Sequence, residues 1–188
     1  MRGTSWRIIG SLVVAAALLG SVACREVSDV GSANPATHHV GAVTPTPTEA
    51  ILDVLAEVRR LTQPFRSLAV AKNAGYNAQL TGCMESPPAG GMGIHYGFPG
   101  LIDGNVQPFA PEILMYEPQA NGDLLLVGVE YVVPFTAWTS PSPPELAGVP
   151  FHRNDVFRLW VLHAWIWKTN PSGLLSDWNP RVTCQYAP

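Results

Sequence analysis

The chain has 188 residues, of which 47% are hydrophobic and only 13% are charged, and its formal net charge is -3. This length predicts a single domain. The composition excludes a coiled coil, a collagen-like chain and a largely disordered chain. The slight acidic excess argues against nucleic acid as a partner, because binding to phosphates requires clustered lysine and arginine.

The N-terminal residues have the pattern of an export signal. Arg2 and Arg7 precede an apolar run over residues 8–19, and small residues follow the run as far as Cys24. The run is shorter than the roughly 20 residues that span a bilayer, which is typical of a signal peptide rather than a membrane anchor. We therefore expect residues 1–23 to be removed and the protein to be exported to the cell envelope.

The residues before Cys24 resemble the cleavage site of bacterial lipoproteins, in which the cysteine becomes the lipidated first residue of the mature protein. Ser21 stands where that family prefers leucine, and simple secretion is the alternative. The resemblance implies a lipid on Cys24 that attaches the protein to a membrane. Residues 24–45 lack apolar periodicity and are rich in small and polar residues, which predicts a flexible tether to one domain over residues 46–188.

The domain begins with a predicted pair of helices or one kinked helix. Residues 46–49 read Thr, Pro, Thr and Glu, which is typical of a helix N-cap, a first-turn proline and the glutamate of a capping box. Apolar residues then recur at helical spacing from Ile51 to Leu61. Pro64 interrupts this pattern, and a second helical run over residues 65–73 precedes Gly75.

Strand-like segments follow the helices. They cover residues 92–98, 112–117, 123–134, 156–168 and, as a fifth candidate, 181–184. Asn121 and Gly122 separate the second from the third, which predicts a β-hairpin and antiparallel pairing. The sequence therefore predicts an α+β fold, with an antiparallel sheet of four or five strands and one or two N-terminal helices packed on one face.

The third and fourth of these strands are apolar on both faces, which predicts central strands covered on each side. Strict alternation in the third strand would place Leu124 and Leu126 on the same face as Glu130. Tyr131 would then lie on the opposite face. The segment over residues 137–150 carries four prolines and is a candidate lid.

The cysteines predict one disulfide bond. If Cys24 carries the lipid, Cys83 and Cys184 remain as an even pair in an oxidising compartment, where a disulfide is expected. The alternative is that these two thiolates hold a metal. The close-spaced cysteine pairs of zinc sites are absent, however.

Three polar residues in predicted strands are candidates for chemistry. Glu130 interrupts an apolar strand, where an unpaired carboxylate is costly and needs a partner or a wet cavity. His163 and His95 interrupt two other strands. If the three converge, they offer ligands for one divalent transition metal, either zinc, iron or copper. No histidine forms a short-range metal motif, so the fold must bring them together.

Two alternatives for these residues remain open. His163 could act as a general base that Glu130 orients, which makes both residues catalytic candidates. Alternatively, His163 is a core histidine bonded to Glu130 or to a backbone carbonyl, and His95 and His152 are surface residues.

The many aromatic residues suggest a ligand pocket. We expect Tyr96, Tyr131 and Trp165 to line a pocket for a small apolar or planar molecule, with the 137–150 segment as its roof. The alternative is a plain aromatic core. Three functions therefore remain: an exported, lipid-anchored domain that binds a small ligand or a metal, an enzyme using the same cluster, and a structural or interaction module of the cell envelope.

Overall fold

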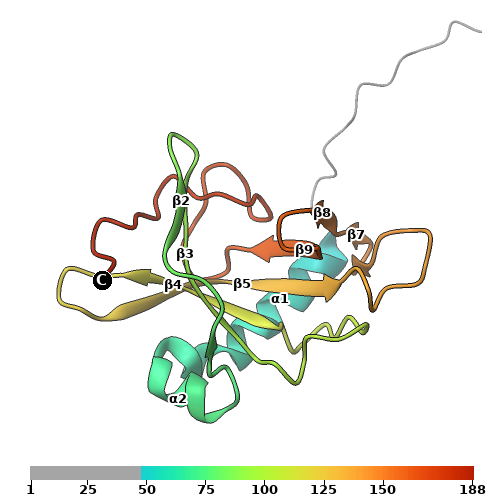
Figure 1. Ribbon diagram of the computed structural model, residues 1–188, viewed down its shortest axis with the longest axis horizontal. Helices are drawn as coiled ribbons and strands as arrows, with labels where there is room; N and C mark the ends of the chain where they lie inside the picture. The colour runs from blue at the N-terminus through green and yellow to red at the C-terminus, as the bar shows by residue number, and fades with distance from the viewer. Residues whose placement is uncertain (1–47) are drawn as a thin grey trace, which may run out of the picture. The chain divides into compact units, whose positions relative to one another are not determined.

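A computed structural model describes residues 48–188 of the chain (Figure 1). The predicted signal peptide, the predicted lipid on Cys24 and the whole predicted tether over residues 24–45 lie outside the described residues, so those expectations stay predictions. In the described part, no helix has both the length and the apolar character needed to cross a membrane.

The helical pair is confirmed, with a break where Pro64 predicts one. Helix α1 covers Glu49–Leu61, the 3-10 helix η1 covers Gln63–Arg66 and α2 covers Leu68–Asn73. The predicted capping box is wrong, because Thr48 is the N-cap and makes no side-chain cap hydrogen bond. Glu49 is therefore the first residue of the helix, whereas a capping box needs its glutamate three residues after the cap.

The predicted α+β class and the antiparallel sheet are confirmed. The strands run in the spatial order β1-β3-β4-β5-β9-β8, β2 also pairs with β3, and all pairs are antiparallel. The long strands are β3 (Gly90–Gly97), β4 (Ile113–Pro118), β5 (Leu124–Pro134) and β9 (Leu159–Ala164). The short strands β1 (Ala78–Gln79), β2 (Met84–Ser86) and β8 (His152–Asn154) add to the predicted number.

Two of the predicted strands differ from the structure. Residues 181–184 form turns and irregular structure, so the fifth candidate strand is wrong. The fourth strand ends at Ala164 because the chain bends there. The segment over residues 137–150 contains a separate hairpin of β6 (Glu145–Leu146) and β7 (Val149–Pro150).

A β-bulge in β5 explains why strict alternation gave the wrong faces. Met115 pairs with Gly128 and Tyr116 pairs with Leu126, so Val127 has no partner on β4. One extra residue reverses the alternation beyond it. Leu126 therefore shares the main hydrophobic core with Tyr131 instead of sharing a face with Glu130.

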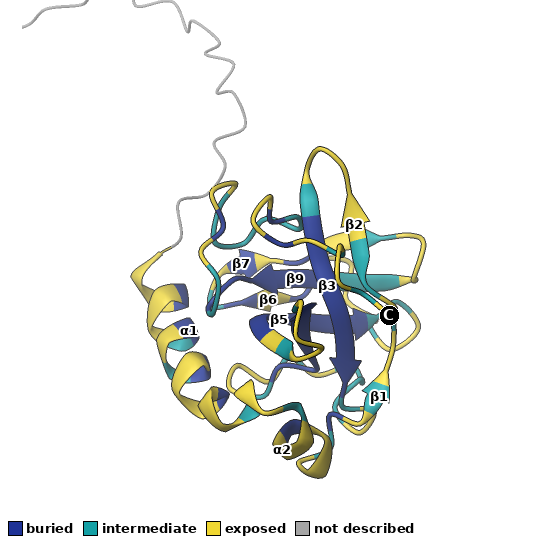
Figure 2. Ribbon diagram, turned by 90° about the vertical axis from the view of Figure 1, so that its left-hand side faces the viewer, coloured by how far each residue is buried: buried dark blue, intermediate teal, exposed yellow. Residues whose placement is uncertain are grey.

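The helices cover one face of this sheet, which we call the helix face. Figure 2 shows α1 with its buried residues directed toward the strands and its exposed residues directed outward. Ile51, Leu55 and Val58 from α1 pack in one cluster with Leu114 and Leu162 from the sheet. This cluster is the main core of the domain.

The C-terminal segment, residues 165–188, returns to β3 (Figure 1). The predicted Cys83–Cys184 disulfide is confirmed. Gly91 and Asn179 exchange two backbone hydrogen bonds of 3.1 and 3.0 Å. Gly90 permits this approach, because its φ is +109° and a Cβ there would lie 2.2 Å from the carbonyl oxygen of Asn179.

Candidate functional site

The sheet register brings His95, Glu130 and His163 together on the face opposite the helices, which we call the cavity face. Glu130 on β5 pairs directly with His163 on β9. His95 lies on β3 and points to the same face. One ligand atom from each of the three residues lies within 4.8 Å of the other two. The structure therefore unites the three predicted metal-ligating residues in one buried group, which we call the His–Glu–His cluster.

The distances in the cluster are slightly longer than hydrogen bonds. His95 Nε2 lies 3.6 Å from one carboxylate oxygen of Glu130, and His163 Nε2 lies 3.5 Å from the other. All three residues are at most 6% exposed. The alternative in which His95 is a surface residue is therefore wrong, whereas half of the His152 side chain is exposed.

The outer nitrogen of each cluster histidine has its own partner. His95 Nδ1 lies 2.9 Å from Thr81 Oγ1, and His163 Nδ1 lies 3.1 Å from Asp177 Oδ1. These contacts direct both Nε2 atoms toward Glu130. His163 Nε2 is fully buried and has no hydrogen-bond partner within residues 48–188.

Burial and charge shift the protonation of this group. Burial and, to a smaller extent, the neighbouring His163 lower the pKa of His95 to about 3, so His95 is neutral. Burial raises the pKa of the Glu130 carboxyl. Burial alone would lower the pKa of His163, but the carboxylates of Glu130 and Asp177 raise it above its ordinary value.

Asp177 connects the cluster to the surface. Its second oxygen lies 3.2 Å from His152 Nε2, and the ring of His152 stacks on that of His163 at 6.5 Å. Burial acts to raise the pKa of Asp177, but hydrogen bonds with the two histidines bring it below its ordinary value. Asp177 is therefore an anionic partner for His163.

A cavity of about 350 Å³ lies in front of the His–Glu–His cluster. Its walls are mostly apolar and include Ile113 and Val161 from the sheet and Trp178 from the C-terminal segment. The turn between β8 and β9 borders the cavity with Val156 and Phe157. A buried polar group thus meets an apolar space.

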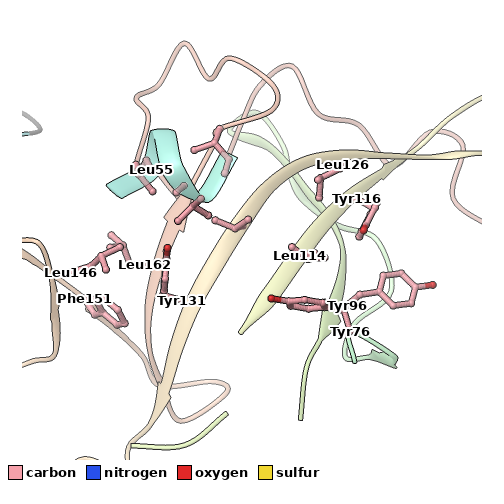
Figure 3. Close-up of a cluster of buried hydrophobic side chains, with 14 of the residues drawn as sticks. Leu55, Tyr76, Tyr96, Leu114, Tyr116, Leu126, Tyr131, Leu146, Phe151 and Leu162 are labelled. Atoms are coloured by element: carbon pink, nitrogen blue, oxygen red, sulfur yellow. The ribbon is translucent and has the colours of Figure 1, made fainter. Parts of the chain in front are cut away.

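The predicted ligand-binding aromatics lie elsewhere. Tyr96 and Tyr131 belong to the main core on the helix face (Figure 3), where their hydroxyls donate to Gln79 Oε1 and to the carbonyl of Pro108. Neighbouring residues in a strand point to opposite faces. Tyr96 follows His95 and Tyr131 follows Glu130, so neither tyrosine can share a cavity with its neighbour.

Neither Trp165 nor the predicted lid borders the cavity. Trp165 packs in a small cluster with Met115, Val127 and Val182. The 137–150 segment inserts Leu146 into the main core. The β8–β9 turn borders the cavity instead, in the position that was predicted for the 137–150 segment. The prediction of a pocket lined by Tyr96, Tyr131 and Trp165 is therefore corrected: the two tyrosines lie in the main core, and Trp165 lies in a smaller one.

Thr81 and Asp177 are the site residues that the sequence did not reveal. Both lie in irregular segments, where no periodicity indicates the direction of a side chain. Asp177 reaches His163 because the Gly91–Asn179 bridge holds its segment against β3.

Comparison of the chain with protein families, with curated proteins and with solved structures finds no match. A fold by itself does not define a function, so function must be argued from the site. In the described part of the chain, the buried His–Glu–His cluster is a group that could hold a metal ion.

Proposed function

We propose that this protein is an exported, lipid-anchored domain that binds one divalent transition metal through His95, Glu130 and His163. Two imidazole nitrogens and one carboxylate oxygen form a donor set that suits zinc, iron or copper. The disulfide supports the exported part of the proposal, because such bonds persist in oxidising compartments.

The observation that carries the proposal is the unpaired Nε2 of His163. A buried polar atom without a partner costs free energy, and nearly all such atoms in proteins are paired. Asp177 holds the other nitrogen of the same ring. Metal-binding histidines usually have this arrangement, in which a carboxylate orients the ring and its free nitrogen coordinates the ion.

The spacing of the cluster also supports a metal. A tetrahedral ion with bonds of about 2.0 to 2.2 Å holds two of its ligand atoms roughly 3.4 Å apart. The nitrogen–oxygen distances are 3.6 and 3.5 Å, close to this value, but each runs to a different oxygen of Glu130. One ligand atom from each residue lies within 4.8 Å of the other two, so an ion held by a single oxygen would draw the three atoms together. Direct hydrogen bonds between the same atoms would bring them to about 2.7 to 3.2 Å.

Elemental analysis tests the proposal. The chain is produced in an oxidising compartment and purified without chelator or histidine tag. We expect close to one zinc, iron or copper ion per chain, lost in a double variant with His95→Ala and His163→Ala. The matched control replaces His38 and His39, two histidines outside the described residues, and it should keep the metal.

Two results count against the metal site. One is metal-free protein of ordinary stability that also fails to bind added Zn²⁺. The other is metal that remains in the His95→Ala, His163→Ala variant but disappears in the His38 and His39 control. Circular dichroism and a thiol assay for the intact disulfide verify that each variant is folded.

The same site supports a second candidate function, a metal-dependent enzyme. Three protein ligands leave a fourth metal position free, as in catalytic zinc sites, and the cavity adjoins the cluster. The alternative is an enzyme that needs no metal. In that enzyme His163 would be the general base, and both Glu130 and Asp177 would orient its ring. Turnover that survives complete removal of metal by a chelator would favour the metal-free form.

A further inference from the structure

We propose that the cavity binds a small, mostly apolar molecule that places one oxygen donor on the metal. This inference rests on the proposed metal site and names the kind of ligand that the site takes.

The size of the cavity favours a small molecule. Its volume of about 350 Å³ lies near the lower end of the range of roughly 300 to 1,000 Å³ for small-molecule sites. Ile113 and Val161 contribute apolar surface from the central strands, and Met84 and Met92 contribute it from β2 and β3. These walls offer a ligand mainly van der Waals contact and removal of its apolar surface from water.

The polar side chains of the cavity gather around one point. Apart from Asn154 and the indole of Trp178, every polar lining side chain belongs to the His–Glu–His cluster or contacts it within hydrogen-bond distance. Thr81 contacts His95, and Asp177 contacts His163. A matching ligand therefore needs one polar group, directed at the cluster, and an apolar remainder.

Exposed apolar side chains border the cavity at both edges of the sheet. Leu80, which follows β1 at one edge, is 45% exposed. Val156 and Phe157, in the turn that joins β8 to β9 at the other edge, are 85% and 48% exposed. Exposed apolar residues grouped around a cavity are typical of ligand sites. An apolar ligand would cover part of this surface.

The donor atom would occupy the free metal position. With His95, Glu130 and His163 as three ligands, a tetrahedral ion has one remaining position for water or a ligand. A carboxylate oxygen is a suitable donor for zinc and for cobalt. A fatty carboxylate thus combines the required donor with an apolar chain.

Octanoate is the probe, and butanoate is its short-chain control. Isothermal titration calorimetry is performed on the full chain loaded with Zn²⁺. Each additional buried methylene strengthens binding by a few-fold, so we expect octanoate to bind at least about tenfold more tightly than butanoate. Equal affinities would overturn the inference.

A matched pair of variants locates the binding site. Phe157→Ser removes an exposed aromatic ring that borders the cavity, and we expect it to weaken octanoate binding by about threefold or more. Leu125→Ser removes a side chain of similar exposure on β5 that does not line the cavity, and it should leave the affinity unchanged. Equal effects of the two substitutions would contradict binding in this cavity.

Cobalt spectroscopy separates failure of the inference from failure of the metal site. With Co²⁺ in place of zinc, we expect octanoate to shift the visible absorption bands, because its oxygen replaces a water on the ion. Bound cobalt with bands that octanoate leaves unchanged would overturn the donor contact and leave the metal site standing. No cobalt or zinc binding at all would overturn the proposed function itself.

Discussion

The two faces of the sheet differ in how they satisfy their polar groups, although the same strands build both. On the helix face, Tyr131 is fully buried and its hydroxyl donates to the carbonyl of Pro108 at 2.7 Å. On the cavity face, the preceding residue Glu130 meets two histidines at distances longer than hydrogen bonds. The polar groups of the helix face are paired within the protein. The cavity face retains polar groups that a bound ion or ligand would pair with.

The elements that cover each face explain this difference. Helix α1 inserts a stripe of apolar side chains between the strands and the solvent, which fills the helix face. The cavity face is covered in part by residues 165–188, an irregular segment fixed by the disulfide and by the Gly91–Asn179 bridge. An irregular cover leaves space above the strands that regular helix packing would remove.

The largest expected effect comes from removing the disulfide that fixes this cover. The bond joins residues 101 positions apart, and cross-linking a loop of that length stabilises a protein by about 4 kcal/mol. We expect the Cys83→Ser, Cys184→Ser variant to lose about that much free energy of unfolding in urea denaturation. Metal affinity should fall as well, since Asp177 lies in the released segment. Unchanged stability and affinity would show that the cover is held by other contacts.

The second effect is confined to the helix face. Leu114 is fully buried in the main core, and truncation of such a leucine costs about 3 kcal/mol. We expect Leu114→Ala to lower the free energy of unfolding by this amount while metal affinity stays within about twofold, because the side chain points away from the cluster. A folded Leu114→Ala protein that loses its metal would contradict the independence of the two faces.

The sequence predicted much of this architecture because the relevant signals were local. The apolar spacing of α1, the break at Pro64 and the Asn121–Gly122 hairpin each depend on a few neighbouring residues. Glu130 was recognisable as a site residue because an ionisable side chain in an apolar strand requires a partner. The disulfide could be predicted because the domain contains only two cysteines.

The remaining features depend on contacts distant in the sequence. The bulge at Val127 arises from pairing with β4, so it could not be predicted from the sequence of β5 alone. Asp177 becomes a partner of His163 only after residues 165–188 have returned to β3. Tyr96 and Tyr131, in contrast, are each the strand neighbour of a residue assigned to the cavity, so strand alternation alone directs both side chains to the other face.

The third expected effect concerns the pH dependence of stability, which a buried carboxyl next to the start of β4 should cause. Glu112 is 1% exposed, and its pKa is raised to about 8, mainly by burial and to a smaller extent by the carboxylates of Asp103 and Glu130. Between about pH 4.5 and pH 8, the Glu112 carboxyl therefore keeps its proton in the folded protein and has lost it in the unfolded chain. Stability from this group is complete below about pH 4.5 and is lost as the pH rises through about 8.

The substitution Glu112→Gln removes this titration but keeps an oxygen that can accept the N–H of Val132. We expect the variant to match the wild type near pH 4.5 and to exceed its stability by about 2 kcal/mol at pH 9, because relaxation and water entry relieve part of the charge burial. Urea denaturation at several pH values measures the difference. A difference that stays constant with pH would mean that Glu112 is already ionised in the folded protein.

The smallest expected effect on stability is the most specific for the site. Asp177 orients His163 without belonging to the core, so Asp177→Asn should lower the free energy of unfolding of the metal-free protein by only about 1.5 kcal/mol, the low end for a hydrogen bond to a charged group. Metal affinity should nevertheless fall by about tenfold or more, as it does when the carboxylate behind a metal-binding histidine is removed. Competition with a chromophoric zinc chelator measures that affinity.

Asp155→Asn is the matched control for this last substitution. Asp155 is exposed in the β8–β9 turn and forms a surface ion pair with Arg153 at 2.8 Å, an interaction that contributes little to stability. It should leave both the free energy of unfolding and the zinc affinity nearly unchanged. If the two variants have the same zinc affinity, the ion does not depend on the orientation of His163. The unpaired Nε2 would then lose its role as the atom that the cavity face offers to a metal.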